Sequence, residues 1–139
     1  MSSSETDKPY NVTGLKRVLN ACVFSLEGIA STLKHEEAFR QEMILTALLV
    51  PLALVLPVSA LAKVALIAVL FGVLIVELLN TAVEVTVNYI STSNHPLAKR
   101  AKDMGSGAVF LSLLNAVVVW TIILSGNWAD ITGWLQAGF

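Results

Sequence analysis

Charged residues are scarce in this sequence. Of its 139 residues, 14% are charged and 55% are hydrophobic, whereas charged residues make up about a quarter of an ordinary soluble domain. This balance excludes an ordinary soluble domain of this size and predicts a protein whose solvent is the membrane. The net charge is -1 and no run of Lys or Arg occurs, which excludes a strongly basic surface for nucleic acid.

The sequence has one cysteine and lacks the known phosphate-binding motifs. Cys22 is the single cysteine, which excludes an intrachain disulfide and any metal site built from several cysteines. No Walker motif is present, and the GSG segment at Gly105 is too short for a phosphate-binding loop. Residues 1–12 are polar and contain no apolar stretch of the signal-peptide kind, so we expect a flexible N-terminus there.

Long apolar runs make up most of the remaining chain. Each of three runs is long enough to cross a hydrocarbon layer of roughly 30 Å at about 1.5 Å per residue. An earlier segment mixes apolar and polar residues at helical spacing, which indicates an amphipathic helix lying on the membrane or packed only on protein. The sequence predicts an all-α integral membrane three-helix bundle with an N-terminal amphipathic surface helix. The expected elements are one domain at 13–125, with a surface helix at about 14–33 and spans at about 37–56, 59–89 and 104–125, and a short periplasmic tail at 126–139.

The distribution of basic residues predicts the orientation in the membrane. Lys99, Arg100 and Lys102 lie between the second and third spans, whereas the turn between the first two spans contains only Lys63. The positive-inside rule therefore makes the longer segment cytoplasmic. With three spans, the N-terminus is then cytoplasmic and the C-terminal tail periplasmic.

A polar stripe on the second span is the most informative feature. Glu77, Asn80, Glu84 and Asn88 are separated by three, four and four residues, so they project from one face of a helix. An ionisable residue at membrane depth indicates a functional site, because burying it there is costly. The alternative for Glu77 and Asn80 is a structural hydrogen bond between helices.

Two further polar clusters have simple structural explanations. Glu36 and Arg40 are one helical turn apart and could form an ion pair. Lys102 and Asp103 precede the third span and could anchor it at the membrane boundary. Together with the stripe, however, these residues supply carboxylates, cations and an amide at one boundary, a set that suits phosphoryl transfer. Carboxylates can hold Mg²⁺ on ATP phosphates, and a base at lipid depth can take a proton from a lipid hydroxyl.

Three motifs resemble those of the prokaryotic diacylglycerol kinase family. They are EEAFRQE at 36–42, ELLNTAVE at 77–84 and HPLAKRAKDMGSGAV at 95–109, and the resemblance covers about residues 14–125. It implies a homotrimer in the bacterial inner membrane, with sites between protomers. It also implies that the protein phosphorylates diacylglycerol with ATP and Mg²⁺ to give phosphatidic acid at the cytoplasmic interface.

The resemblance also implies roles for individual residues. Glu77 matches the general base and Asn80 a residue beside it, and Glu77 and Ser106 match positions near the lipid substrate. Glu36 and Glu84 match the carboxylates that bind the metal. The implied nucleotide contacts are Arg17, Phe24, Glu36, Glu84, Ser93, Asn94, His95, Lys102 and Asp103. Two positions depart from the family pattern, since Asn88 stands where Asp is frequent and Phe24 where Tyr is common.

Two other functions fit the sequence. An undecaprenol kinase would use the same chemistry on a polyprenyl alcohol, although the FRQE and MGSGAV segments favour the diacylglycerol branch. A non-catalytic accessory protein of the membrane would use the acidic stripe only to hold helices together.

Overall fold

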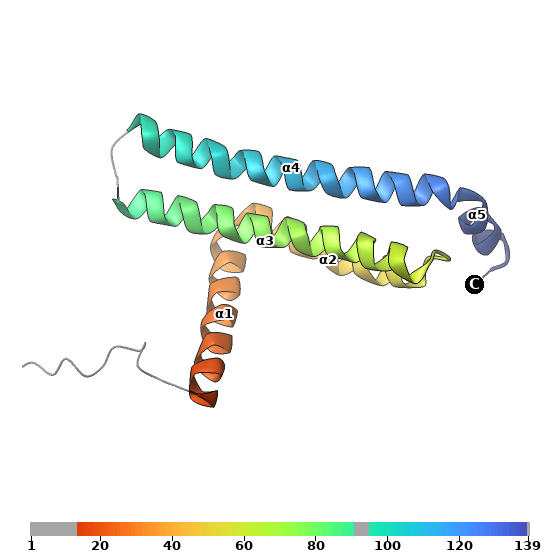
Figure 1. The fold of residues 1–139 in the computed structure, drawn as a ribbon, viewed down its shortest axis with the longest axis horizontal. Helices are drawn as coiled ribbons and strands as arrows, with labels where there is room; N and C mark the ends of the chain where they lie inside the picture. The colour runs from red at the N-terminus through yellow and green to blue at the C-terminus, as the bar shows by residue number, and fades with distance from the viewer. Residues whose placement is uncertain (1–13, 91–94, 139) are drawn as a thin grey trace, which may run out of the picture. The chain divides into compact units, whose positions relative to one another are not determined.

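The computed structural model describes residues 14–90 and 95–138, and these form five helices (Figure 1). The chain divides into two units, one that contains α1 and a second that contains α2 to α5. The expected flexible N-terminus and the predicted nucleotide contacts Ser93 and Asn94 lie outside the described residues. The helices are α1 (Leu15–His35), α2 (Glu37–Val55), α3 (Ala60–Ile90), α4 (Pro96–Gly126) and α5 (Trp128–Gln136).

Helix α1 is the amphipathic helix expected at about 14–33. Its apolar side chains are exposed, including Leu15 at 75% and Leu26 at 67%. Lys34 and His35 lie in its last turn, where positive charge complements the negative end of the helix dipole. An exposed apolar stripe on a helix with a polar opposite face is typical of a helix that lies in the membrane interface.

Helices α2, α3 and α4 are each long and apolar enough to cross a membrane. Large apolar side chains stay exposed along them, among them Leu48, Phe110 and Ile122 at 64–67%. Such surfaces are stable in hydrocarbon, where the helical backbone satisfies its own hydrogen bonds. The predicted all-α membrane fold with three spans is therefore confirmed.

Helix α3 is the central helix of the second unit. It packs against both α2 and α4, whereas α2 and α4 make no backbone contact with each other in the described parts of the chain. Figure 1 shows α3 and α4 side by side along most of their length. This arrangement leaves a space between α2 and α4 that is lined by α3.

A compact apolar cluster holds the turn end of the bundle together. Ala53, Leu56 and Leu66 are almost fully buried, and Ile131 of α5 is buried against them. The segment expected as a short tail thus contains a helix that folds back onto the bundle.

The turn between α2 and α3 contains Pro57 and Ser59 and lies between the first two predicted spans. Helix α2 ends at Val55, and the Ser59 hydroxyl accepts a hydrogen bond from the Ala62 amide at 3.2 Å. Such a side-chain cap satisfies one of the unpaired donors at the start of a helix. Lys63 closes the turn, because its ammonium donates to the carbonyl of Leu54 at 2.6 Å.

Helix α4 begins eight residues before the predicted third span. Pro96 occupies the first turn, and His95 Nδ1 accepts a hydrogen bond from the Leu97 amide at 3.2 Å. Proline is favoured at the first helical position because its nitrogen has no proton to leave unpaired. Apolarity locates only the membrane-embedded part of the helix, so the basic residues expected in a connecting segment lie instead on the first turns of α4.

We expect Lys63→Met to destabilise the turn between α2 and α3. The variant removes a charge-assisted hydrogen bond to the Leu54 carbonyl in the last turn of α2, an exposed contact that contributes about 1 kcal/mol. Thermal unfolding in detergent micelles should show a lower midpoint for Lys63→Met than for Lys63→Arg, which retains a donor. Equal midpoints for the two variants would contradict this role.

Candidate active site

Glu77 is a buried carboxylate on the most apolar helix of the chain. Its side chain is 5% exposed, and it lies seventeen residues after the start of α3. At 1.5 Å per residue this distance is about 26 Å, close to the hydrocarbon thickness of roughly 30 Å. Glu77 therefore lies near one boundary of the membrane, at the end opposite the α2–α3 turn.

A cavity of about 500 Å³ opens beside Glu77. We call it the Glu77 cavity. It brings together three residues that the sequence singled out, namely Glu77, Asn80 and Ser106, and two polar residues of α2, Gln41 and Glu42. Apolar side chains complete it. The remaining lining residues are Ala38, Leu45, Val109 and Leu113.

Asn80 lies at a close approach of α3 and α4. A Cβ atom built on Gly105 would overlap Asn80 Oδ1 and lie 3.3 Å from Asn80 Cγ. The Asn80 amide donates toward the Glu77 carboxylate. Its Oδ1 is buried without a hydrogen-bond partner among the described residues. A glycine at 105 therefore allows Asn80 to stay beside Glu77 with one acceptor left for a ligand.

Other carboxylates surround Glu77. Glu36 and Glu84 lie near enough to repel its negative charge, and Glu42 interacts with it in the same way. Within residues 14–90 and 95–138, no three His, Cys, Asp or Glu side chains are grouped to hold a metal ion by themselves. One or two carboxylates completed by substrate phosphates are the usual ligands of Mg²⁺. The available carboxylates thus fit a metal that arrives with a nucleotide, and do not form an all-protein cage.

Glu42 is a site residue that the sequence analysis missed. It lines the Glu77 cavity, and its Oε2 atom is buried without a hydrogen-bond partner in the described part of the chain. A signal was present in the sequence, because Glu42 is the last charged residue before the uncharged run of the first span. An ionisable residue at that depth needs a polar partner.

The predicted nucleotide contacts are only partly assembled. Lys102 and Asp103 lie on the first turns of α4, where Asp103 pairs with Lys99 at 2.6 Å. His95 caps the same helix. Arg17 and Phe24 lie two turns apart on α1, in the other unit.

Comparison with known proteins decides the family. The family model of prokaryotic diacylglycerol kinase matches residues 23–124. Diacylglycerol kinase of Pseudomonas aeruginosa is 49% identical over 114 residues, which cover 82% of this chain and 93% of that protein. The chain belongs to the prokaryotic diacylglycerol kinase family.

Two other relatives agree with this assignment. The Escherichia coli diacylglycerol kinase is 42% identical over 114 residues, which cover 82% of this chain and 93% of that protein. The Haemophilus influenzae diacylglycerol kinase is 41% identical over 115 residues, 83% of this chain and 98% of that protein. The family match includes α2, α3 and the Glu77 cavity, and it ends at residue 124, before α5 begins.

The Asn80–Gly105 contact predicts a strong effect of a single methyl group. Gly105→Ala should push the Asn80 side chain away from Glu77 and lower kcat by roughly 10- to 100-fold, since small misplacements near a reacting group have effects of this size. Gly107→Ala is the matched control, because nothing lies within 4 Å of a Cβ at that position. Kinase assays in mixed micelles, with folding checked by circular dichroism, measure both. Equal activity of the two variants would show that Asn80 needs no fixed position.

Proposed function

We propose that this protein transfers the γ-phosphate of ATP to the primary hydroxyl of diacylglycerol and forms phosphatidic acid. The observation that carries the proposal is the buried Glu77 carboxylate, which faces a cavity at the membrane boundary. Diacylglycerol presents its hydroxyl at that depth while its chains remain in the hydrocarbon. Family membership and the names of the relatives support this choice of substrate.

Glu77 acts as the general base in this proposal. Its carboxylate accepts the proton of the lipid hydroxyl as the oxygen attacks the γ-phosphorus, and ADP leaves on the opposite side. Asn80 and Ser106 line the same cavity and are polar, so they orient the hydroxyl toward Glu77. A buried base with a neutral amide beside it is suited to this role, because water is largely kept away from the reacting oxygen.

Glu36 and Glu84 hold Mg²⁺ in this proposal. Both act electrostatically on Glu77, and two carboxylates with phosphate oxygens make a donor set that the ion prefers. When bound together with ATP, Mg²⁺ would neutralise negative charge on the phosphates.

Residues at the start of α4 bind the nucleotide in this proposal. Lys102 is half-buried at the start of α4 and is directed to the phosphates in this proposal, with Asp103 beside it. The further proposed nucleotide contacts are Arg17, Phe24, Ser93, Asn94 and His95, carried over from the family resemblance.

A homotrimer in the bacterial inner membrane completes the proposal. The exposed apolar faces of α2 to α4 are available to lipid and to other copies of the chain. The basic residues Lys99, Arg100 and Lys102 favour a cytoplasmic position for the start of α4, and hence for the Glu77 cavity and the N-terminus.

The first test measures transfer of labelled γ-phosphate from ATP in mixed micelles. Diacylglycerol and undecaprenol are offered side by side. We expect phosphatidic acid as the main product, and Glu77→Gln should lower its rate by about 10²- to 10⁴-fold while nucleotide binding persists, because only the base is lost. Asp130→Asn, which changes an exposed carboxylate on α5 outside the Glu77 cavity, is the control.

Each other result of this assay supports a different function. Product mainly from undecaprenol would identify the protein as a polyprenol kinase. No product from either lipid, with folded protein, would support an accessory role. Full activity of Glu77→Gln would exclude Glu77 as the base.

The metal assignment makes a separate prediction. Glu84→Gln should raise the Mg²⁺ concentration needed for half-maximal transfer by at least about tenfold, as expected when a group around a metal is lost. Mg²⁺ titrations of the wild type, Glu36→Gln, Glu84→Gln and the control Asp130→Asn measure this requirement. An unchanged Mg²⁺ requirement in Glu36→Gln and Glu84→Gln would argue against both as ligands.

A further inference from the structure

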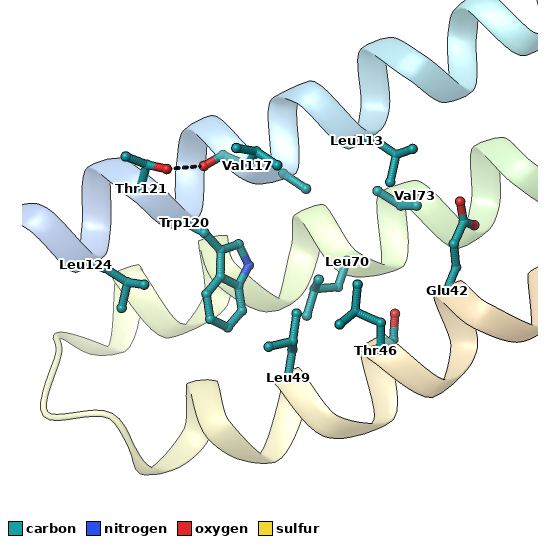
Figure 2. A pocket seen from close by; sticks show the side chains of 12 residues that line it. Glu42, Thr46, Leu49, Leu70, Val73, Leu113, Val117, Trp120, Thr121 and Leu124 are labelled. Carbon is teal, nitrogen blue, oxygen red and sulfur yellow. Dashed lines mark hydrogen bonds between the residues drawn. The ribbon is translucent and has the colours of Figure 1, made fainter. Parts of the chain in front are cut away.

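A second, largely apolar space lies between α2, α3 and α4 (Figure 2). We call it the Trp120 groove, and its volume is about 320 Å³. Most of its lining is aliphatic, and the Thr121 hydroxyl is already satisfied by the carbonyl of Val117 at 2.7 Å. Beyond Glu42 at one end, the groove therefore suits an apolar ligand.

The Trp120 groove continues the Glu77 cavity. Glu42, Leu45 and Leu113 line both spaces. Polarity changes along this path, from Glu77 and Asn80 in the cavity to Leu124 and Trp120 at the far end of the groove. Figure 2 shows Glu42 at one end and Trp120 and Leu124 at the other. A lipid with a polar head group and an apolar chain shows the same change of polarity along its length.

Two contacts between α3 and α4 show which residues of the two helices lie at the same level. Gly105 meets Asn80 at one level, and the Trp120 indole donates to the carbonyl of Leu66 at 3.3 Å at another. Leu66 precedes Glu77 by eleven residues, which corresponds to about 16 Å along a helix. Half of a hydrocarbon core of roughly 30 Å has this length, and half the core is the depth that the acyl chains of one leaflet occupy.

The far end of the groove is held by α5. Trp120 and Leu124 pack against the buried cluster that includes Leu66 and Ile131. Ile131 is 7% exposed and comes from α5, which lies beyond the family match. Trp120 is therefore held from two sides, by its hydrogen bond to α3 and by the cluster that α5 completes.

We infer that the Trp120 groove binds one acyl chain of the lipid substrate, and that Trp120, supported by Ile131, ends the groove and sets the preferred chain length. The inference rests on the proposed function. The occupant is an acyl chain because the groove starts at the cavity that takes the hydroxyl and is mostly apolar beyond Glu42. The distance from Glu77 to the level of Trp120 also matches the depth of one leaflet.

The test narrows the path from Glu77 shortly before it reaches Trp120. Val117 lines the groove. Because Gly105 of α4 lies at the level of Asn80 of α3, Val117 lies about 13 Å beyond the level of Glu77. Val117→Phe should obstruct a long chain and spare a short one that ends before this level. Val118→Phe is the matched control, because Val118 is exposed and lies outside the groove lining. The measurement is kcat/KM for dioleoylglycerol and dioctanoylglycerol in mixed micelles.

The ratio of the two kcat/KM values is the decisive result. Val117→Phe should lower the dioleoyl-to-dioctanoyl ratio by at least about tenfold, the size of effect that apolar pockets give, and Val118→Phe should leave it unchanged. An equal loss on both lipids, or a change in oligomer size with an unchanged ratio, would overturn the inference and make the groove a contact between copies. Failure of the wild type to phosphorylate either lipid would instead refute the proposed function.

The role of α5 is tested by Ile131→Ala. Loosening the end of the groove should raise the same ratio, whereas Leu135→Ala, one turn further on α5 and exposed, should not. A lower thermal midpoint with an unchanged ratio would reduce Ile131 to a structural role and overturn this part.

Cross-linking of the wild type by diacylglycerol with a photoreactive chain end gives an independent result. Labels should fall near Trp120 and Leu124, and labelling only outside the groove would contradict the inference.

Discussion

The packing of α3 between α2 and α4 is the constraint on which the rest of the structure depends. Hydrocarbon leaves no water for backbone groups, so each span must be a helix, and the helices must then associate through close packing and polar contacts. Helix α3 makes both kinds of contact, with Leu66 buried at one end and Asn80 against Gly105 at the other. Because α2 and α4 both pack against α3 and make no backbone contact with each other among the described residues, a continuous space remains between them.

The chemistry of that space follows from its depth in the membrane. A carboxylate such as Glu77 is costly to bury unless a polar group answers it. Asn80 and Ser106 lie in the same cavity, and in the proposed reaction a lipid hydroxyl supplies the remaining partner. Farther from the boundary the lining is mostly aliphatic, and its polar residues there are Thr46 and Thr121. The protein thus repeats the order of polarity of the lipid on which we propose it acts.

Several features of this protein can be predicted from its residues in order. Apolar runs of span length predict three membrane helices, because an isolated helix already satisfies its backbone. The spacing of Glu77, Asn80 and Glu84 places them on one face, since helical periodicity is local. Helix α4 begins eight residues before the predicted third span, because hydropathy responds to the lipid-embedded part of a helix and not to polar first turns such as those at His95 and Pro96.

What the sequence by itself determined was the helical membrane architecture and the polar face of α3, because both depend on interactions between residues close in the chain. Only the tertiary structure decided that Glu42 of α2 shares the Glu77 cavity, that Gly105 fits against Asn80, and that Ile131 closes the far end of the bundle. These contacts join residues far apart in the chain. Their partners are selected by helix register and by close packing, which no local pattern of residues encodes.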